Sequence, residues 1–334
     1  MKVMQWNICK KDNKQSGIKR YEDELYDATS EIIDVSRIQR RGISYLRDIN
    51  HYKENNSDIV HATVQTLAPL KIIKRPDNFV LTVHDIIPTL YYGKLRKLKS
   101  LWFLTERAIP SADMIITISE FSKTELIKYL KIDPDKIRVV PQGINSNYHN
   151  MDKDKCRNLF DLDTGPDTKY ILVVSSNEEW KNMGLLNKII TKYKHPKHKF
   201  IKIGYGQILD HPDIINLGYI SEEKMPYLYN ACDLFIHPST YEGFGLPPLE
   251  AMACGCPVIS SNSASLPEVI GDAGILLDGY DVDSWVYQID RVLSDSYLRN
   301  NLIKKGLNRS NKFSWHNTAQ KTIEIYEEML SSRY

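Results

Sequence analysis

Cysteine is scarce in this sequence, and the few cysteines form no pattern. The 334 residues include five cysteines, an odd number without the paired spacing of a zinc site or a disulfide framework. Cys254 and Cys256 stand among alanine, glycine and proline, where cysteine usually serves as a small buried apolar residue. We therefore expect a chain that folds without disulfides in a reducing, cytoplasmic compartment.

Long apolar runs and an excess of one charge are also absent. No run of about 18 apolar residues occurs, and the first residues lack the apolar segment of a signal peptide. The 44 basic and 42 acidic residues leave a formal net charge of +2, which gives no strong field for nucleic acid. The sequence thus predicts a protein without a nucleic-acid partner, either soluble or bound to a membrane at its surface.

The segment 94–107, "KLRKLKSLWFLTER", departs from this balance. A helix with this sequence would carry a basic face beside leucine, tryptophan and phenylalanine, as helices that lie on anionic membrane surfaces do. The alternative is an ordinary solvated helix whose apolar stripe faces the core. The segment is therefore a candidate for peripheral membrane contact.

Short apolar runs alternate with helix-like stretches along the whole chain, which is longer than a usual single domain. A polar interval near 145–168 separates two series of runs. Runs of β-branched and aliphatic residues spaced by helices are typical of parallel sheets covered on both faces. The sequence predicts an α/β fold of two doubly wound domains, over residues 1–146 and 147–315, with a terminal helix over 316–334.

The runs expected as strands share a length of four to eight residues. In order they lie in "MKVMQWNI", "EIIDVS", "DIVHAT", "FVLTVHD", "MIITIS" and "IRVVPQG", then in "KYILVVSS", "KFIKIGY", "IINLGYI", "LFIHPS", "PVISS" and "GILLD". Ligands of open parallel sheets bind beyond the carboxyl ends of the strands. The turns after the strands are therefore where functional residues are expected.

One such turn places two carboxylates, Glu242 and Glu250, around a loop rich in glycine and proline. After the run "LFIHPS", a short helix is expected, with Pro248 near its start and Gly255 just beyond its end. Glu250 would then lie in the first helical turn, where the helix dipole favours its ionised form. Backbone N–H groups at residues 243–245 and at the helix start suit a phosphate or sugar hydroxyls.

Two acids in one turn could also serve a different purpose. They could form the acid–base pair of a glycoside hydrolase, although an ionised carboxylate suits an acceptor of hydroxyl hydrogen bonds better than a proton donor. Glu250 could also serve only to stabilise the start of its helix.

The stretch "STYEGFGLPPLEAMACGCPVISSNSASLPEVIGDAGILLD" resembles the donor-site signature of retaining glycosyltransferases of family 4, with its Glu-x7-Glu pair. Further blocks resemble that family in its order, among them "FVLTVHDIIP", "ADMIITISEFSKTEL", "IRVVPQGIN" and "LGYISEEKMPYLYNACDLFIHPS". The resemblance implies a GT-B fold: two Rossmann-like domains facing each other across a cleft, with the C-terminal helix packing back toward the N-terminal domain. It also implies retaining, metal-independent transfer of a hexose from a nucleotide diphosphate sugar, linked to GDP or UDP, without a further cofactor.

The resemblance assigns roles to residues of the second domain. Glu250 would bind the ribose hydroxyls of the nucleotide, and Glu242 would hold hydroxyls of the donor sugar near the reacting carbon. Lys181 would neutralise the diphosphate, for which a compact charge on a flexible stem is suited. The donor loop would be completed by Gly243, Phe244, Gly245 and Leu246.

In the first domain, Gly17 would open the first helix and offer free N–H groups to a phosphate. The family commonly has a third glycine in this loop, where this chain has Lys19, whose ammonium could reach a phosphate instead. His84 matches the family's cleft histidine beside the donor sugar. A glycine or histidine at such a position is also commonly structural.

A second departure concerns the diphosphate site. The family usually carries an arginine shortly before the lysine, whereas Ser175, Ser176 and Trp180 occupy the corresponding places here. This departure keeps open an alternative, a non-catalytic subunit of a glycan-assembly complex that binds nucleotide sugars. A further alternative is an NAD(P)-dependent oxidoreductase, but the Gly-x-Gly-x-x-Gly turn that it requires after the first strand is missing.

The predictions of the transferred sugar and of its acceptor each rest on a single segment of the sequence. The loop "EGFGLPPLEAM" resembles that of mannosyl- and glucosyl-transferring members, which favours mannose. The basic segment 94–107 favours a glycan acceptor that is lipid-linked, at the cytosolic face of a membrane.

Overall fold

The computed structural model describes residues 1–8, 17–39, 57–91, 100–205 and 211–331. It divides into two compact units. The amino-terminal unit comprises Met1–Gly143 and Ser314–Tyr334, and the carboxy-terminal unit comprises Ile144–Phe313. The last helix therefore belongs to the unit in which the chain begins.

The described part of the amino-terminal unit contains a six-stranded parallel sheet in the order β2-β1-β3-β4-β5-β6. Its strands are β1 (Lys2–Asn7), β2 (Asp34–Gln39), β3 (Ile59–Ala62), β4 (Phe79–Val83), β5 (Met114–Thr117) and β6 (Ile137–Val139). Its helices are α1 (Gly17–Ser30), α3 (Pro69–Lys74), α4 (Ile87–Tyr91), α5 (Ser100–Ala108), α6 (Glu120–Leu130) and α14 (Trp315–Ser331). Short 3-10 turns are η1 (Gln65–Leu67), η3 (Ile109–Ser111) and η4 (Pro134–Lys136).

The described part of the carboxy-terminal unit contains a second six-stranded parallel sheet, in the order β12-β11-β10-β7-β8-β9. Its strands are β7 (Lys169–Val174), β8 (His198–Ile203), β9 (Ile214–Gly218), β10 (Leu234–His237), β11 (Val258–Ser261) and β12 (Ile275–Leu277). Its helices are α7 (Lys153–Asn158), α8 (Met183–Lys192), α9 (Met225–Ala231), α10 (Leu246–Ala253), α11 (Leu266–Ile270), α12 (Val282–Ser294) and α13 (Ser296–Ser310). Short 3-10 turns are η5 (Glu179–Lys181), η6 (Glu222–Lys224) and η7 (Gly271–Ala273).

The predicted α/β class, with two parallel sheets, is confirmed. Each apolar run expected as a strand overlaps one, the first helix begins at Gly17 as predicted, and the last begins at Trp315, one residue before its predicted start. Of the basic segment, residues 94–99 lie outside the described residues, and the remainder belongs to α5. None of the described helices is both long and apolar enough to cross a membrane.

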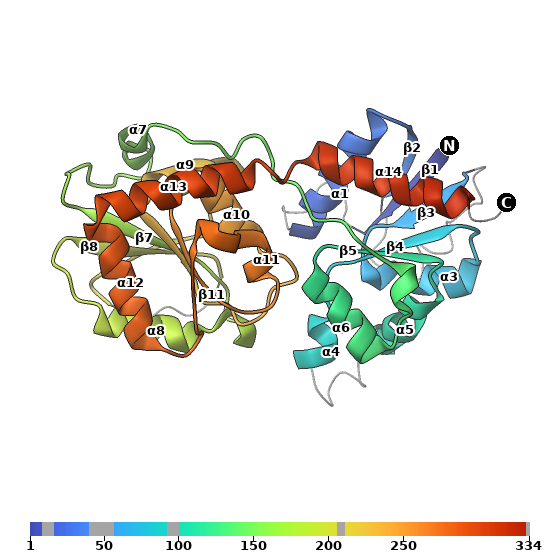
Figure 1. The fold of residues 1–334 in the computed structure, drawn as a ribbon, viewed down its shortest axis with the longest axis horizontal. Coiled ribbons are helices and arrows are strands. Elements are labelled where there is room, and N and C mark those ends of the chain that lie inside the picture. Colours follow the sequence, from blue (N-terminus) through green and yellow to red (C-terminus); the bar gives the residue numbers. More distant parts are fainter. Residues whose placement is uncertain (9–16, 40–56, 92–99, 206–210, 332–334) are drawn as a thin grey trace. The chain divides into compact units, whose positions relative to one another are not determined.

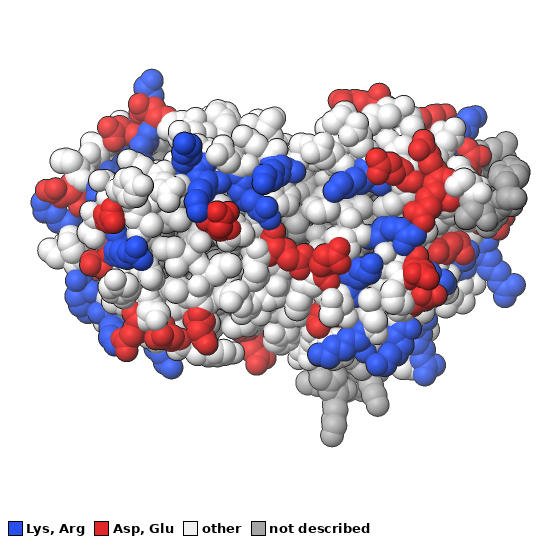
Figure 2. All heavy atoms as spheres, in the orientation of Figure 1, with Lys and Arg blue, Asp and Glu red and all other residues white. Residues whose placement is uncertain are grey.

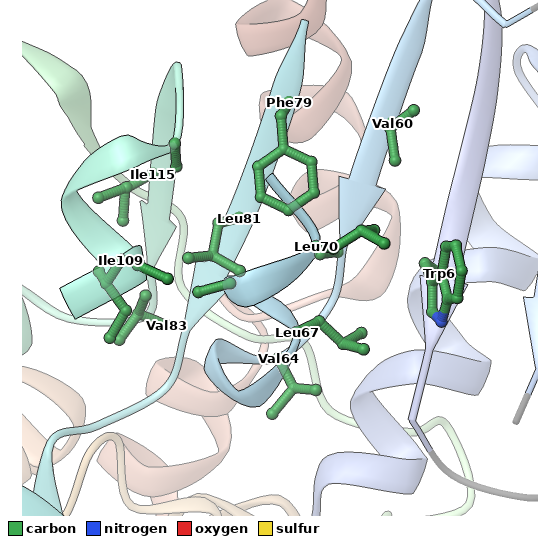
Figure 3. Packing of buried hydrophobic residues seen from close by; sticks show 14 of the residues in the cluster. Trp6, Val60, Val64, Leu67, Leu70, Phe79, Leu81, Val83, Ile109 and Ile115 are labelled. Carbon is green, nitrogen blue, oxygen red and sulfur yellow. The ribbon is translucent and has the colours of Figure 1, made fainter. Parts of the chain in front are cut away.

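Strands β3, β4 and β5 of the amino-terminal sheet are buried on both faces because their consecutive residues alternate between two cores. Figure 3 shows one core, where Phe79, Leu81 and Val83 of β4 lie near Leu70 of α3. Val80, between them in sequence, belongs to the core on the opposite face. Apolar residues on both faces of a strand are what a parallel sheet covered by helices requires.

Helix α14 covers that opposite face and lies beside α1, so the last helix of the chain packs next to the first described one (Figure 1). Ile323, Tyr326 and Met329, spaced by three residues along α14, are buried against Val3 and Ile59. Residues three and four apart share one face of a helix. The C-terminal helix therefore packs onto the N-terminal sheet, as predicted.

A buried polar network fastens α14 to this sheet. The Nδ1 atom of His61 lies 2.7 Å from the hydroxyl of Tyr326, and its Nε2 atom lies 2.8 Å from Oγ1 of Thr82. Thr82 in turn lies 3.1 Å from the hydroxyl of Tyr21 on α1. Burial, with a smaller effect of His84, lowers the pKa of His61 to about 3. Both ring nitrogens of this fully buried histidine are used, which is how buried polar groups are normally satisfied.

Stability should fall on mild acidification. Burial also lowers the pKa of His84 to about 4, so the folded state binds fewer protons than the unfolded state below the ordinary histidine pKa of about 6.5. The contribution of each histidine to the free energy of unfolding is complete above about pH 6.5 and is lost as the pH falls toward its pKa in the folded state. Each histidine adds a slope of up to about 1.4 kcal/mol per pH unit. Calorimetric unfolding from pH 7.5 to 5 measures the slope.

The variant His61→Leu removes the contribution of His61, while those of the other buried histidines, His84 and His198, remain. We expect it to be less stable than the parent at pH 7.5, because Tyr326 and Thr82 lose a partner, and to show a shallower pH slope. The exposed His149, replaced by glutamine, is the control and should leave the slope unchanged. An equal slope in His61→Leu and the parent would contradict the assignment.

Candidate functional site

The predicted site residues of the carboxy-terminal unit lie where its strand order reverses. Strands β7 and β10 are neighbours, but the chain continues from β7 toward β8 and from β10 toward β11, on opposite sides. The carboxyl ends of two such strands leave a crevice that binds ligands in open α/β sheets. Lys181 closes the 3-10 turn after β7, and Glu242 lies in the loop after β10.

Lys181 and Glu242 form an ion pair at this point. The lysine Nζ lies 2.7 Å from Oε1 of Glu242, and the side chains are 20% and 13% exposed. The same oxygen lies 3.0 Å from Nε2 of His237, the last residue of β10, whose side chain is 1% exposed. One carboxylate oxygen thus receives two donors.

These contacts fix the protonation of Glu242. Burial alone would raise its pKa, but the charge of Lys181 and the hydrogen bond from His237 outweigh burial and lower the pKa to about 2. The side chain is therefore a carboxylate at neutral pH, able to accept hydrogen bonds but not to donate a proton. The glycoside-hydrolase alternative needs a protonated acid in this pair, and Glu242 does not provide it.

Backbone contacts hold the two segments in place. The N–H and Oγ1 groups of Thr240 donate to the carbonyl of Trp180 over 2.7 and 3.2 Å, which fixes the loop next to Lys181. The hydroxyl of the buried Ser265 contacts the carbonyls of Glu242 (2.9 Å) and Phe244 (2.7 Å). The ion pair therefore rests on an ordered backbone, as a preorganised site requires.

The expected position of Glu250 in the first helical turn is wrong. Helix α10 begins at Leu246, which makes Glu250 its fifth residue. Its carboxylate is 3% exposed, and Oε2 accepts a hydrogen bond of 2.9 Å from Tyr229. Burial and the neighbouring Glu250 raise the pKa of Tyr229 well above its ordinary value, so the tyrosine stays a donor. A tyrosine hydroxyl, rather than the helix start, thus orients this carboxylate.

The remaining predicted residues, Gly17, Lys19 and His84, belong to the amino-terminal unit. Gly17 is the exposed first residue of α1, and a Cβ there would meet nothing within 4 Å. Lys19 pairs with Asp23 at 2.5 Å, so its ammonium already has a carboxylate partner. His84 follows β4, is 6% exposed, and its Nε2 lies 3.0 Å from the carbonyl of Thr63.

Residue patterns alone did not identify His237, Tyr229, Thr240 and Ser265. A signal was available for His237, which ends a predicted strand five residues before Glu242. No comparable signal marks Tyr229, which lies on a different helix from the carboxylate that it contacts. Among the described residues, no group of three or more histidine, cysteine, aspartate or glutamate side chains could hold a metal ion.

Comparisons with known proteins cover both units. Residues 154–309 match the model of Glycosyl transferases group 1, and residues 16–148 match the model of Glycosyltransferase Family 4. The O-antigen chain mannosyltransferase B of Escherichia coli is 33% identical over 76% of this chain and 71% of its own length.

Solved structures agree on the fold. Sucrose-phosphate synthase from Thermosynechococcus elongatus is 18% identical and covers 99% of both chains with a TM-score of 0.80. The Anabaena protein Alr3699/HepE, solved in complex with UDP-glucose, is also 18% identical and covers 99% of this chain and 100% of its own with a TM-score of 0.76. At this identity the likeness is one of fold, and it extends over the whole chain.

Replacing Gly245 by alanine should damage this site. Gly245 precedes α10 with φ of 116°, a conformation that side chains disfavour, and a Cβ would approach Cδ2 of Leu266 to 3.0 Å. We expect Gly245→Ala to destabilise the carboxy-terminal unit by about 1–3 kcal/mol. The control is Gly184→Ala in α8, where a Cβ meets nothing within 4 Å and the change should be neutral or stabilising. Urea unfolding compares the two, and equal stabilities would overturn the assignment.

Proposed function

Because the chain belongs to glycosyltransferase family 4 and is a glycosyltransferase, we propose that it transfers a hexose with retention of configuration and without an essential metal. The donor is a nucleotide diphosphate sugar, and the acceptor is a hydroxyl of a glycan. The observation that carries this proposal is the Lys181–Glu242 pair at the reversal of strand order. An ammonium and a buried carboxylate in one crevice suit a ligand with both phosphates and hydroxyls.

Each residue of the site has a part in donor binding under this proposal. Lys181 faces the diphosphate while remaining close to Glu242, and Glu242 accepts hydrogen bonds from the donor sugar. Glu250, oriented by Tyr229, accepts hydrogen bonds from the ribose. The donor loop approaches the sugar through its backbone, along Gly243, Phe244, Gly245 and Leu246. For His84, Gly17 and Lys19 of the amino-terminal unit, the donor contacts that the sequence resemblance implies remain part of the proposal.

The reaction proceeds by displacement on one face of the sugar. The bond from the anomeric carbon to the phosphate oxygen breaks as the acceptor oxygen bonds to that carbon, and the departing phosphate oxygen takes the acceptor's proton. Lys181 stabilises the negative charge of the leaving diphosphate, which is usually the largest protein contribution to such a rate. Glu242, with its pKa lowered to about 2, positions the sugar and does not act as an acid.

Mannose is the hexose that the relatives favour. The E. coli relative is an O-antigen chain mannosyltransferase, and the Anabaena protein of the same fold was solved with UDP-glucose. GDP-mannose is therefore the first donor to test and UDP-glucose the second. A growing polysaccharide or lipid-linked oligosaccharide is the corresponding acceptor class.

The alternative that the sequence left open, a non-catalytic subunit that binds nucleotide sugars, would require this chain to have lost the activity of its family. The observation in its favour is the absence of an arginine before Lys181, where Ser175 and Ser176 stand. Membership of a glycosyltransferase family excludes the oxidoreductase alternative. A non-catalytic subunit would bind a nucleotide sugar but would neither transfer the sugar nor slowly hydrolyse the donor.

Removal of either member of the ion pair should abolish transfer. We expect Glu242→Gln and Lys181→Ala to lower kcat/KM with GDP-mannose or UDP-glucose by at least about 100-fold, because sugar positioning and leaving-group charge are lost. Lys192→Ala is the control, since Lys192 is the exposed last residue of α8 and pairs with the exposed Asp283 of α12. Circular dichroism establishes that each variant is folded. Full activity in a folded Glu242→Gln or Lys181→Ala variant would refute these roles.

We also propose that the amino-terminal unit contacts an anionic membrane surface through α3 and α5, which pack against each other. Large apolar side chains are exposed on both helices: Ile72 (54%), Ile73 (51%), Phe103 (38%) and Leu104 (53%). Basic side chains accompany them, and the guanidinium of Arg107 lies 4.2 Å from the centre of the Phe103 ring. On the face seen in Figure 2, basic and acidic side chains are intermixed. Apolar side chains among cations suit the headgroup region of acidic lipids.

Vesicle binding tests this surface. We expect the protein to co-sediment with phosphatidylglycerol vesicles and not with phosphatidylcholine vesicles, and the double variant Ile72→Ser/Ile73→Ser to lose most of this binding. Ile32→Ser is the control, because Ile32 is similarly exposed (44%) between α1 and β2. Equal binding by the double variant and the parent would contradict the proposed membrane surface.

A further inference from the structure

His237 is held rigidly beside the donor loop. It is the last residue of β10, pairs in register with Ser260 of β11, and its carbonyl accepts a hydrogen bond of 3.2 Å from the hydroxyl of Ser260. Pro238 follows, and the residue before a proline is confined to extended backbone. Its ring is 1% exposed and stacks on Phe235, with centroids 5.7 Å apart. The imidazole therefore has a fixed place and orientation.

Only one of the two ring nitrogens of His237 has a hydrogen-bond partner among the described residues. Nε2 must carry the hydrogen, because its partner Glu242 is an ionised carboxylate that can only accept. Nδ1 is buried and has no hydrogen-bond partner among the described residues. The buried His61, by contrast, uses both nitrogens. A histidine serving only the fold would be expected to satisfy both of its nitrogens, whereas the side-chain bond of His237 goes to the proposed sugar-binding carboxylate.

The contacts of Lys181 and His237 decide which carboxylate oxygen of Glu242 is left for a ligand. Lys181 and His237 both contact Oε1, while Oε2 accepts no hydrogen bond from the described residues. A lysine is a flexible partner that follows a turning carboxylate. The imidazole is rigid, so it opposes rotation that would exchange the two oxygens. Glu242 is thus held with Oε1 toward the protein and Oε2 available.

The neighbouring carboxylate, Glu250, is oriented by a residue of the same group of aromatic rings. The ring of Phe235 also meets the ring of Tyr229, with centroids 5.7 Å apart, and Tyr229 donates to Glu250. Tyr229 meets Phe235 edge to face and Phe235 stacks on His237, so this row of three rings has a hydrogen-bond donor at each end, and each donor contacts one member of the acid pair. The contact of His237 belongs to a packed arrangement that holds both acids.

We propose that His237 is a positioning residue for sugar recognition: it fixes Glu242 so that Oε2 alone accepts a hydroxyl of the donor sugar. This inference rests on the proposed function of the site. It assigns His237 to recognition of the sugar portion of the donor, separate from the diphosphate, which Lys181 contacts. His237 exchanges no proton with the substrate and touches no reacting atom.

Three variants test this role. His237→Gln places an amide N–H at the position of Nε2 and keeps the bond to Glu242. His237→Asn has a polar side chain too short to reach, and His237→Phe keeps the ring without a donor. We expect the asparagine and phenylalanine variants to lose about 10- to 100-fold in kcat/KM with the sugar nucleotide, the range for losing a hydrogen bond to a charged group. The glutamine variant should stay within about threefold of the parent.

The discriminating readout is binding of the free nucleoside diphosphate, measured by calorimetry beside the sugar nucleotide. We expect GDP or UDP to bind all three variants as it binds the parent, while the sugar nucleotide binds the asparagine and phenylalanine variants more weakly. A structural role would weaken both ligands together and would not be restored by glutamine. Equal loss of both ligands, or parental kinetics in His237→Phe, would overturn the inference. Absence of sugar-nucleotide binding by the parent would instead refute the proposed function.

Discussion

The ion pair between Lys181 and Glu242 is the interaction on which the carboxy-terminal site depends. It joins the segments that leave two adjacent parallel strands in opposite directions, where the fold itself opens a crevice. Neither charge is fully solvated, so each is tolerated because the other is close. Removing one member would leave a partly buried charge unpaired, and so the pair fixes both the geometry and the electrostatics of the crevice.

The two carboxylates of the Glu-x7-Glu pair have different surroundings although the same loop connects them. Glu242 has a cationic partner and a rigid imidazole, whereas Glu250 is almost fully buried and receives a hydrogen bond from Tyr229. An acceptor next to a lysine suits the part of a donor that adjoins the phosphates. An acceptor held by a neutral hydroxyl suits the uncharged ribose. Under the proposed function, these two surroundings correspond to the donor sugar and to the ribose.

Sequence patterns predicted the elements and the charged residues, because both are local properties. Apolar runs located the strands, the turn after one of them brought Glu242 into consideration, and the family resemblance added Lys181. The error over Glu250 arose because proline and glycine mark a helix only to within a turn, and Leu246 begins the helix earlier than Pro248 suggested. Tyr229 could not be predicted, since its contact with Glu250 joins α9 to α10 and exists only after packing. Which side chains contact a functional residue is therefore decided by tertiary packing.

Two of the buried histidines, His61 and His237, show how one residue type serves different ends in one chain. His61 joins β3 to α14 and to Thr82 with both ring nitrogens, so its ring completes a network that fastens the C-terminal helix. His237 leaves Nδ1 without a described partner and directs Nε2 at a carboxylate in the crevice. Burying an unsatisfied nitrogen is unfavourable, and it persists where the surrounding structure compensates for it. The strand pairing, Pro238 and the Phe235 ring provide that compensation, and the fold thereby holds a single carboxylate oxygen toward the ligand.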